Sequence, residues 1–297
     1  MSVRIIGFYE SLRTFLNIAE GGIPLDNSNY ALQMQDITVE FPGVLANNHV
    51  SIDCKKGEVL GLLGENGAGK TTLMNVLYGL YEPTTGKVFW DGKEVHITPP
   101  LKAIKNGIGM VHQHFKLVDT LSVIENVILG IKDDKQRLDL ESAKKRLLEL
   151  CEEYELYVDP DEVVWRLPVG KQQWVEILKA LYRDCKLLIL DEPTAVLTEK
   201  EAAALLESIR GMASRGIAVI FITHRLQEVL NVCDKVVIMR DGKVVKDTPA
   251  SETSVDEITK CMVGRSVDLS AVREVRDCSD ARTIMSIRKL WVDMPGE

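Results

Sequence analysis

The stretch Gly64-Glu65-Asn66-Gly67-Ala68-Gly69-Lys70-Thr71 lies between a strand-like apolar run and a helix-like run. It matches the phosphate-loop pattern G-x-x-x-x-G-K-[ST] at every fixed position. Glycines let the backbone bring successive N–H groups close to phosphate oxygens, and the following helix directs its positive dipole end at the same anion. We therefore predict a site for a nucleoside triphosphate. The alternative, a glycine-rich turn that spells the motif by chance, is disfavoured by the strand-loop-helix setting.

Each residue type in the loop has an expected role. Lys70 reaches the β- and γ-phosphates as a point charge, and the hydroxyl of Thr71 is a ligand for Mg²⁺. The flanks agree, since residues 58–63 read as a buried strand and apolar residues recur at helical spacing after the loop, at Leu73, Val76, Leu77 and Leu80. The residues expected to hold the triphosphate are Asn66, Gly67, Ala68, Gly69, Lys70, Thr71 and Thr72.

Composition indicates a globular protein. The 297 residues are 45% hydrophobic and 27% charged, enough for one large domain or two small ones. No apolar stretch approaches the roughly 18 residues of a membrane span, and Glu10 and Arg13 interrupt any secretory signal. We expect a soluble, cytoplasmic chain.

Cysteine spacing and net charge exclude other classes. The six cysteines form no C-x-x-C pair, which favours free thiols over disulfides or a zinc site. A net charge of −8 without a separate basic patch argues against binding nucleic acid.

The pattern along the chain predicts an α/β fold in several parts. An extension, residues 1–28, precedes a domain over residues 29–265, which begins as an antiparallel β layer with turns at 41–43 and 91–92. A helical subdomain is expected over about 116–175, with an apolar stripe made by Leu140, Ala143, Leu147, Leu150 and Tyr154. Strand-like runs at 187–190, 217–223 and 236–239, with a helix over 199–213, predict a mostly parallel core sheet that closes in a hairpin at 241–242.

One internal repeat concerns the end of the chain. The spacing of apolar residues over 32–43, ending in Phe-Pro-Gly, returns over 285–296, ending in Met-Pro-Gly. We expect a linker over 266–282 and the start of a second copy of the domain over 283–297. Coincidence is the alternative, because the match is short.

Two carboxylates follow a predicted buried strand at Asp191 and Glu192. Ligands of open α/β sheets bind at the carboxyl ends of the strands. Asp191 is expected to hold Mg²⁺, directly or through water, and Glu192 to take a proton from the water that attacks the γ-phosphate. A solvated turn before Pro193 is the alternative.

Two further polar residues follow neighbouring strand-like runs. His224 is a candidate sensor of the γ-phosphate, although a helix cap or a packed residue is the commoner role for such a histidine. Gln113 can contact Mg²⁺ or the attacking water, so we include it among the catalytic residues and metal ligands. His112 and His114 would lie on one face of an extended strand, where a metal pair is less expected than two surface side chains.

With these motifs in this order, the chain resembles the nucleotide-binding subunit of an ABC transporter, over residues 30 to about 265. The resemblance implies a P-loop NTPase fold of the ABC type, and it places Phe41 where an aromatic ring stacks on adenine. The resemblance becomes more specific in segments 111–117, 121–127 and 191–198. These segments are similar to the first half of the fused two-domain ATPases that serve simple-sugar and nucleoside importers, and they are most similar to the nucleoside branch.

One segment departs from the family pattern. The family signature is Leu-Ser-Gly-Gly-Gln, whose serine and backbone N–H groups grip the nucleotide of an opposing domain, and here residues 167–171 read Leu-Pro-Val-Gly-Lys. Pro168 has neither a hydroxyl nor an N–H to donate, although its ring suits a helix start. Because such domains pair head to tail, we expect one strong and one weak nucleotide site in the pair.

The resemblance implies ATP hydrolysis that drives import of a nucleoside or simple sugar, with ATP and Mg²⁺ as cofactors. Implied partners are a second nucleotide-binding domain, fused or dimeric, transmembrane permease subunits and, indirectly, an extracytoplasmic solute-binding protein. The implied location is peripheral, at the cytoplasmic face of the membrane. A non-transport ABC ATPase of translation or repair would need a long basic linker or coiled coil, and residues 266–282 show neither. A phosphate-loop kinase would leave Gln113 and His224 without a role.

Overall fold

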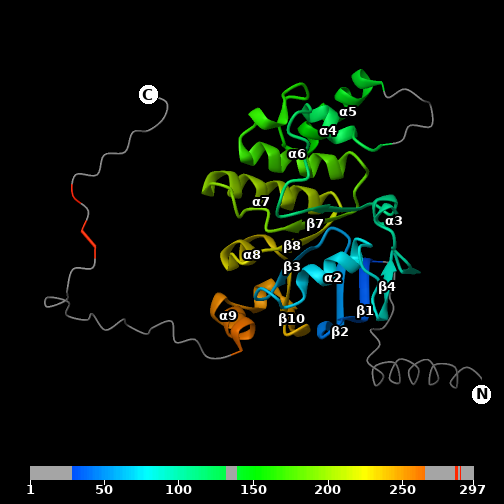
Figure 1. Cartoon of the computed structure of the whole chain (residues 1–297), viewed down its shortest axis with the longest axis vertical. Helices are drawn as coiled ribbons and strands as arrows, with labels where there is room; N and C mark the ends of the chain where they lie inside the picture. The colour runs from blue at the N-terminus through cyan, green and yellow to red at the C-terminus, as the bar shows by residue number, and fades with distance from the viewer. Residues whose placement is uncertain (1–28, 132–138, 265–284, 287, 289–297) are drawn as a thin grey trace, which may run out of the picture. The chain divides into compact units, whose positions relative to one another are not determined.

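The computed structural model describes residues 29–131, 139–264, 285, 286 and 288 (Figure 1). The strands are β1 (Tyr30–Phe41), β2 (Val44–Lys55), β3 (Val59–Leu63), β4 (Thr85–Trp90), β5 (Lys93–Val95), β6 (Ile108–Val111), β7 (Leu187–Asp191), β8 (Ala218–Ile222), β9 (Lys235–Arg240) and β10 (Lys243–Pro249). The α-helices are α2 (Lys70–Leu77), α3 (Pro100–Lys105), α4 (Val123–Ile128), α5 (Leu140–Tyr154), α6 (Val169–Leu181), α7 (Glu199–Ser214), α8 (Leu226–Val232) and α9 (Val255–Val263), with short 3-10 turns η1 (Val164–Arg166) and η2 (Ala250–Glu252).

The core is a six-stranded sheet in the order β10-β9-β3-β8-β7-β6. The pairs β9–β3, β3–β8, β8–β7 and β7–β6 are parallel, and only the edge pair β10–β9 is antiparallel. The mostly parallel sheet predicted from the sequence is confirmed. Its strands β3, β8 and β7 end side by side, so the residues that follow them gather at one edge.

This sheet is buried on both faces, which explains why its strands are continuous apolar runs instead of alternating ones. In β8, Val219 and Phe221 join one hydrophobic core, and Ala218 and Ile220 join the other. The first core also takes in α5 to α8, and the second takes in α2, β1 and β2. The sheet is therefore the rigid platform on which the loops at its edge are mounted.

A separate four-stranded antiparallel sheet has the order β2-β1-β4-β5. The predicted turns hold, because residues 42–43 join β1 to β2 and residues 91–92 join β4 to β5. The hairpin predicted at 241–242 is likewise present between β9 and β10. In Figure 1 this sheet is drawn in blue to cyan beside α2.

The helical part holds α4, α5 and α6, which pack on one another (Figure 1). Its last helix runs to Leu181, beyond the end expected near residue 175. Most of the predicted apolar stripe of α5 is confirmed, since Ala143 and Leu147 are buried and Leu150 and Tyr154 pack against the same core, but Leu140 is 42% exposed. Cys151 is a further buried residue on this face that the sequence analysis did not include.

Other expectations have mixed outcomes. Leu80 does not extend the buried face of α2, because the helix ends at Leu77 and Leu80 is 50% exposed. The five cysteines of the described part are free thiols. Within that part, no helix is both long and apolar enough to cross a bilayer. The predicted extension, linker and second copy fall on residues 1–28, 266–282 and 283–297, which lie outside the described residues apart from 285, 286 and 288.

Candidate nucleotide site

The phosphate loop joins β3 to α2. Gly69 is the N-cap of α2 with φ of 96°, and no side chain caps this helix. The N–H groups of the first helical residues, Lys70, Thr71 and Thr72, therefore have no partner within the helix. Gly64 has φ of 152°, and a Cβ there would lie 2.4 Å from the Met239 carbonyl oxygen. The loop thus exposes backbone donors at a helix N-terminus, which is an anion site by construction.

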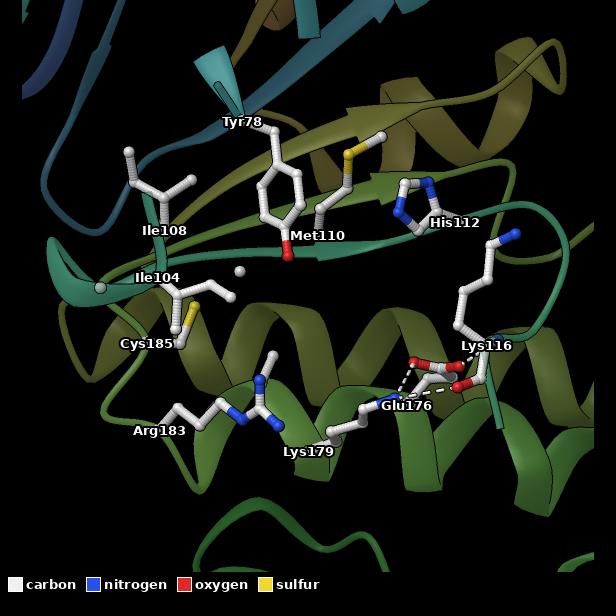
Figure 2. A pocket seen from close by; sticks show the side chains of 13 residues that line it. Tyr78, Ile104, Ile108, Met110, His112, Lys116, Glu176, Lys179, Arg183 and Cys185 are labelled. Carbon is white, nitrogen blue, oxygen red and sulfur yellow. Dashed lines mark hydrogen bonds and ion pairs between the residues drawn. The ribbon is translucent and has the colours of Figure 1, made fainter. Parts of the chain in front are cut away.

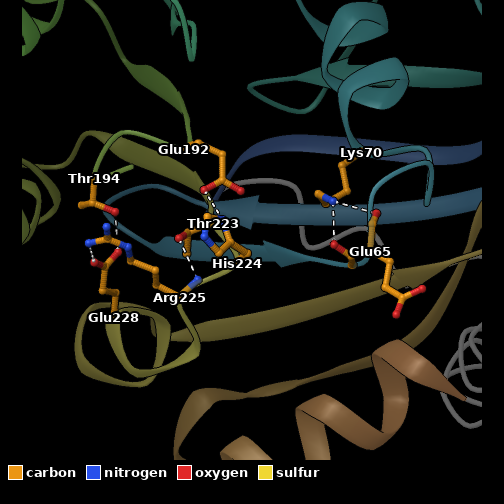
Figure 3. Close-up of polar contacts among 9 residues, drawn as sticks. Glu65, Lys70, Glu192, Thr194, Thr223, His224, Arg225 and Glu228 are labelled. Carbon is orange, nitrogen blue, oxygen red and sulfur yellow. Dashed lines mark hydrogen bonds and ion pairs between the residues drawn. The ribbon is translucent and has the colours of Figure 1, made fainter. Parts of the chain in front are cut away.

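Lys70 folds back over the loop (Figure 3). Its Nζ donates to the carbonyl oxygens of Gly64 at 2.7 Å and Glu65 at 3.1 Å. Burial lowers the pKa of the Lys70 ammonium, and the nearby carboxylates of Glu192 and Asp191 act against that shift. The ammonium and both carboxylates predicted from the sequence therefore share one electrostatic environment.

Asp191 ends β7 and Glu192 follows it. Burial raises the pKa of the Asp191 carboxyl, and the negative charge of Glu192 raises it further. A carboxylate that loses hydration in this way gains from a cation beside it. Glu192 takes a left-handed φ of 51°, and its N–H donates to the carbonyl oxygen of Ile222 at 2.8 Å. This backbone bond ties Glu192 to the end of the neighbouring strand β8.

His224 follows β8 and meets Glu192. Its Nδ1 lies 2.8 Å from Oε2 of Glu192, which is hydrogen-bond distance for an Nδ1–H donor (Figure 3). The histidine side chain is 68% exposed and the glutamate side chain 18% exposed. The imidazole therefore keeps a free edge toward solvent, which excludes the packed role that was the alternative.

A second polar network supports the segments that carry these two residues. Thr194, which is fully buried, donates its hydroxyl to Glu228 at 2.7 Å, and Arg225 Nη1 donates to the other oxygen of Glu228 at 3.2 Å. Figure 3 shows that the Glu228 carboxylate joins the segment after β7 to the segment after β8. No sequence motif used above pointed to Glu228.

The segment after β6 departs from expectation at two residues. The strand ends at Val111, so His112 and His114 do not lie on an extended strand. The His112 ring packs edge-on against Tyr78 at 6.2 Å, and burial lowers the pKa of its imidazole. Gln113 is exposed two residues beyond the end of β6, the strand that pairs with β7.

Phe41 lies at the tip of the β1–β2 hairpin, and its ring meets Tyr81 edge-to-face with a centroid distance of 5.4 Å.

A hollow at the phosphate loop is lined by Gly64, Glu65, Asn66, His224 and Met262. Met262 belongs to α9, far along the chain, and a lone apolar residue in a helix gives no sequence signal of such a position. The loop and His224 therefore face a common space.

The oxygen donors available here are the Thr71 hydroxyl, the Asp191 carboxylate and the Gln113 amide. Hard divalent cations prefer such oxygen ligands. Within the described part of the chain there is no group of three or more His, Cys, Asp and Glu side chains placed to hold a metal ion.

Residues 167–171, which differ from the family signature, lead into the start of α6. Pro168 is the N-cap and provides no side-chain bond. The Lys171 ammonium binds the carbonyl oxygen of Tyr157 and lies 4.0 Å from the centre of the Trp174 ring. A Cβ at Gly170 would lie 2.5 Å from Oε1 of Glu201, so a larger residue there would require the Glu201 side chain to move.

A polar hollow lies between β6 and α6 (Figure 2). Glu176, which is 6% exposed, accepts a hydrogen bond from the Lys116 N–H, and Lys179 donates to the Lys116 carbonyl oxygen at 3.0 Å. Tyr78, His112 and Arg183 also line this space. These bonds fasten the segment that contains Gln113 to helix α6.

A phosphate loop on a parallel sheet, with two carboxylates and a histidine at the same edge, defines a P-loop nucleotide-binding domain. Residues 47–195 match the family model described as ABC transporter. The chain belongs to the ABC transporter family.

Curated relatives agree with this membership. The chain is 44% identical over 276 residues to the nucleoside import ATP-binding protein NupA of Lactococcus lactis subsp. cremoris (strain MG1363), a match that covers 89% of this chain and 54% of the relative. It is 46% identical over 265 residues to the guanosine import ATP-binding protein NupO of Bacillus subtilis (strain 168), covering 89% and 51%. The chain spans about half the length of these relatives.

A solved structure has the same fold. The ADP conformation of MJ1267, an ATP-binding cassette of an ABC transporter, superposes with a TM-score of 0.69 at 25% identity, covering 80% of this chain and 96% of that one. The ABC-type fold expected from the sequence is confirmed.

Proposed function

We propose that this chain binds ATP with Mg²⁺ and hydrolyses it to power the import of a nucleoside or a simple sugar. The observation that carries this proposal is the meeting of Lys70, Asp191, Glu192 and His224 at the strand ends beside the phosphate loop. The relatives named for nucleoside and guanosine import support the transport role and favour it over a non-transport ABC ATPase.

In this proposal the chain's own residues divide the work. The N–H groups of the loop and Lys70 bind and orient the phosphates, and Phe41 stacks on adenine. Thr71, Asp191 and Gln113 are the proposed ligands of Mg²⁺, which when bound neutralises phosphate charge. Glu192 accepts the proton of the attacking water, and His224 senses the γ-phosphate while its Nδ1 holds the Glu192 carboxylate in position.

The proposed partners follow from the parts that one domain lacks. A second nucleotide-binding domain, fused or dimeric, would complete the site in a head-to-tail pair. A dimeric cassette supports this proposal: the structure of MJ0796 in a post-hydrolysis state bound to ADP and Pi matches with a TM-score of 0.65 at 25% identity, over 74% of this chain and 98% of that one. Permease subunits would contact the segment around Gln113. The chain itself would be a peripheral protein at the cytoplasmic face of the membrane. A solute-binding protein would act indirectly.

The Pro168 segment adds an asymmetry to this proposal. Since Pro168 supplies neither hydroxyl nor N–H, the site completed by α6 of this chain would be weak. The site built on this chain's own phosphate loop would be the competent one.

The test of the proposed function is ATP turnover by the complete transporter that contains this domain, with the wild-type chain and with Glu192→Gln. Hydrolysis that depends on Glu192 and rises when the imported nucleoside or sugar is supplied supports the proposal. Hydrolysis with no response to any such solute would remove the transport role.

A further inference from the structure

Asn47 is a buried polar residue directly behind the phosphate loop. It lies in β2, opposite Val39 of β1, and has no exposed surface. Its Nδ2 donates to the carbonyl oxygen of Gly69 at 3.1 Å, and in the described part of the chain its Oδ1 is buried without a hydrogen-bond partner. An apolar side chain of similar size would fill this place without leaving a polar atom unpaired. The amide is therefore useful here only through its bond to Gly69.

The Gly69 carbonyl holds a special place in the loop. It accepts the first bond of α2, from the Leu73 N–H at 3.0 Å, and the Asn47 amide adds a second bond. A peptide unit is planar and trans, so its C=O and N–H point in opposite directions. Holding the Gly69 oxygen from behind therefore directs the Lys70 N–H to the other side, toward the phosphate position.

The neighbouring peptide is held in the same way. The Ala68 carbonyl accepts the Gly242 N–H at 3.2 Å, and the Gly242 carbonyl in turn accepts the Asn48 N–H at 2.8 Å. The space is also tight, since a Cβ on Gly69 would lie 2.6 Å from Nδ2 of Asn47. Strand β2 and the 241–242 turn thus form a fixed support behind residues 68 and 69.

From these contacts we infer that Asn47 is a positioning residue for phosphate binding, which holds the Gly69–Lys70 peptide with its N–H aimed at the β-phosphate. The inference rests on the proposed function for the identity of the ligand. Asn47 itself touches no phosphate, because the loop lies between them. Its removal leaves the Leu73 N–H as the remaining donor to the Gly69 oxygen, so the peptide is held less firmly.

The test compares Asn47→Leu with Gln33→Leu, a matched change at another buried amide of the antiparallel sheet, whose Nε2 and Oε1 have no hydrogen-bond partner in the described part of the chain. ATP and ADP are titrated into the full chain by calorimetry. Hydrogen exchange at residues 70–73 is followed in the nucleotide-free protein, and melting temperature reports folding. We expect Asn47→Leu to raise both dissociation constants about fivefold, the size of one net hydrogen bond, with faster exchange and a folded protein. Gln33→Leu should change neither the dissociation constants nor the exchange.

Unchanged affinity and exchange in Asn47→Leu, or equal losses in Gln33→Leu, would overturn the inference. If leucine does not fit the space and the variant fails to fold, Asn47→Ala makes the same test without the added bulk. A wild-type chain that binds no nucleotide would contradict the proposed function instead, and the exchange experiment would still decide whether Asn47 holds the loop.

Discussion

Nδ1 of His224 lies 2.8 Å from Oε2 of Glu192, although the two residues follow different strands of the central sheet. The imidazole occupies one oxygen of the carboxylate and leaves the other available to a water molecule. A general base must be held within hydrogen-bond reach of the proton it takes, so this contact gives His224 a role in orienting Glu192.

Replacing Glu192 by glutamine should stop hydrolysis and leave ATP bound. The amide keeps the shape of the side chain but accepts a proton poorly, so we expect turnover to fall by about 100-fold or more. Nucleotide retained after rapid gel filtration, together with steady-state phosphate release, measures both effects. Undiminished steady-state hydrolysis would refute the assignment of Glu192 as the base.

His224→Ala should lower turnover far more than ATP affinity, because the imidazole acts on the transferred phosphate and on the base, while the loop and Lys70 hold the rest of the triphosphate. We expect a loss of about tenfold to 100-fold in kcat, within the range for positioned acid–base groups. His96→Ala is the control, since His96, just after β5, is also exposed and pairs with Glu82, which precedes β4. A kcat equal to that of the control would show that the 2.8 Å contact has no part in catalysis.

Pro168→Ser should strengthen the weak site of the proposed pair. Serine restores a hydroxyl and an N–H at the N-cap of α6, where both can reach a phosphate of the opposing domain. In the full-length protein we expect a higher turnover and a nucleotide stoichiometry closer to two per pair. If both quantities stay the same, the asymmetry idea loses its support.

Asn126→Leu should destabilise the helical part strongly. The buried Asn126 amide accepts from the Val118 N–H at 2.7 Å and donates to the carbonyl oxygens of Val118 and Ser122, at 3.1 and 3.0 Å. Removing it leaves several buried groups unpaired, which costs about 2–3 kcal/mol of unfolding free energy. Ser122→Ala, which removes only the cap of α4, should cost about 1 kcal/mol. Denaturant unfolding compares the two, and equal losses would contradict this reading of Asn126.

Local sequence was sufficient where the structure depends on local chemistry. The phosphate loop needs glycines at positions such as Gly64 and Gly69, where positive φ or close backbone contact excludes other residues. The turns at 91–92 and 241–242 were predicted because Asp-Gly favours tight hairpins. Strands β7 and β8 were predicted because a sheet buried on both faces requires unbroken apolar runs.

Long-range contacts account for what the sequence did not reveal. Asn47, Glu228 and Met262 acquire their positions only when β2, α8 and α9 reach the loop and the strand ends, and none of them belongs to a local pattern. His112 was misplaced because an apolar run predicts a strand but not the residue at which it stops. Leu80 was given to α2 for the same reason, since helical spacing continues past the glycine that ends the helix.

The most direct test of the account is calorimetric titration of Mg-ATP into this chain and into its Lys70→Ala variant. The account predicts one saturable site per chain, with affinity reduced about tenfold or more when the Lys70 ammonium is removed, since charge-assisted bonds to phosphate are the strong ones. Absence of saturable binding by the wild-type chain, or equal affinity in the two proteins, would contradict the assignment of residues 64–72 as the ATP site.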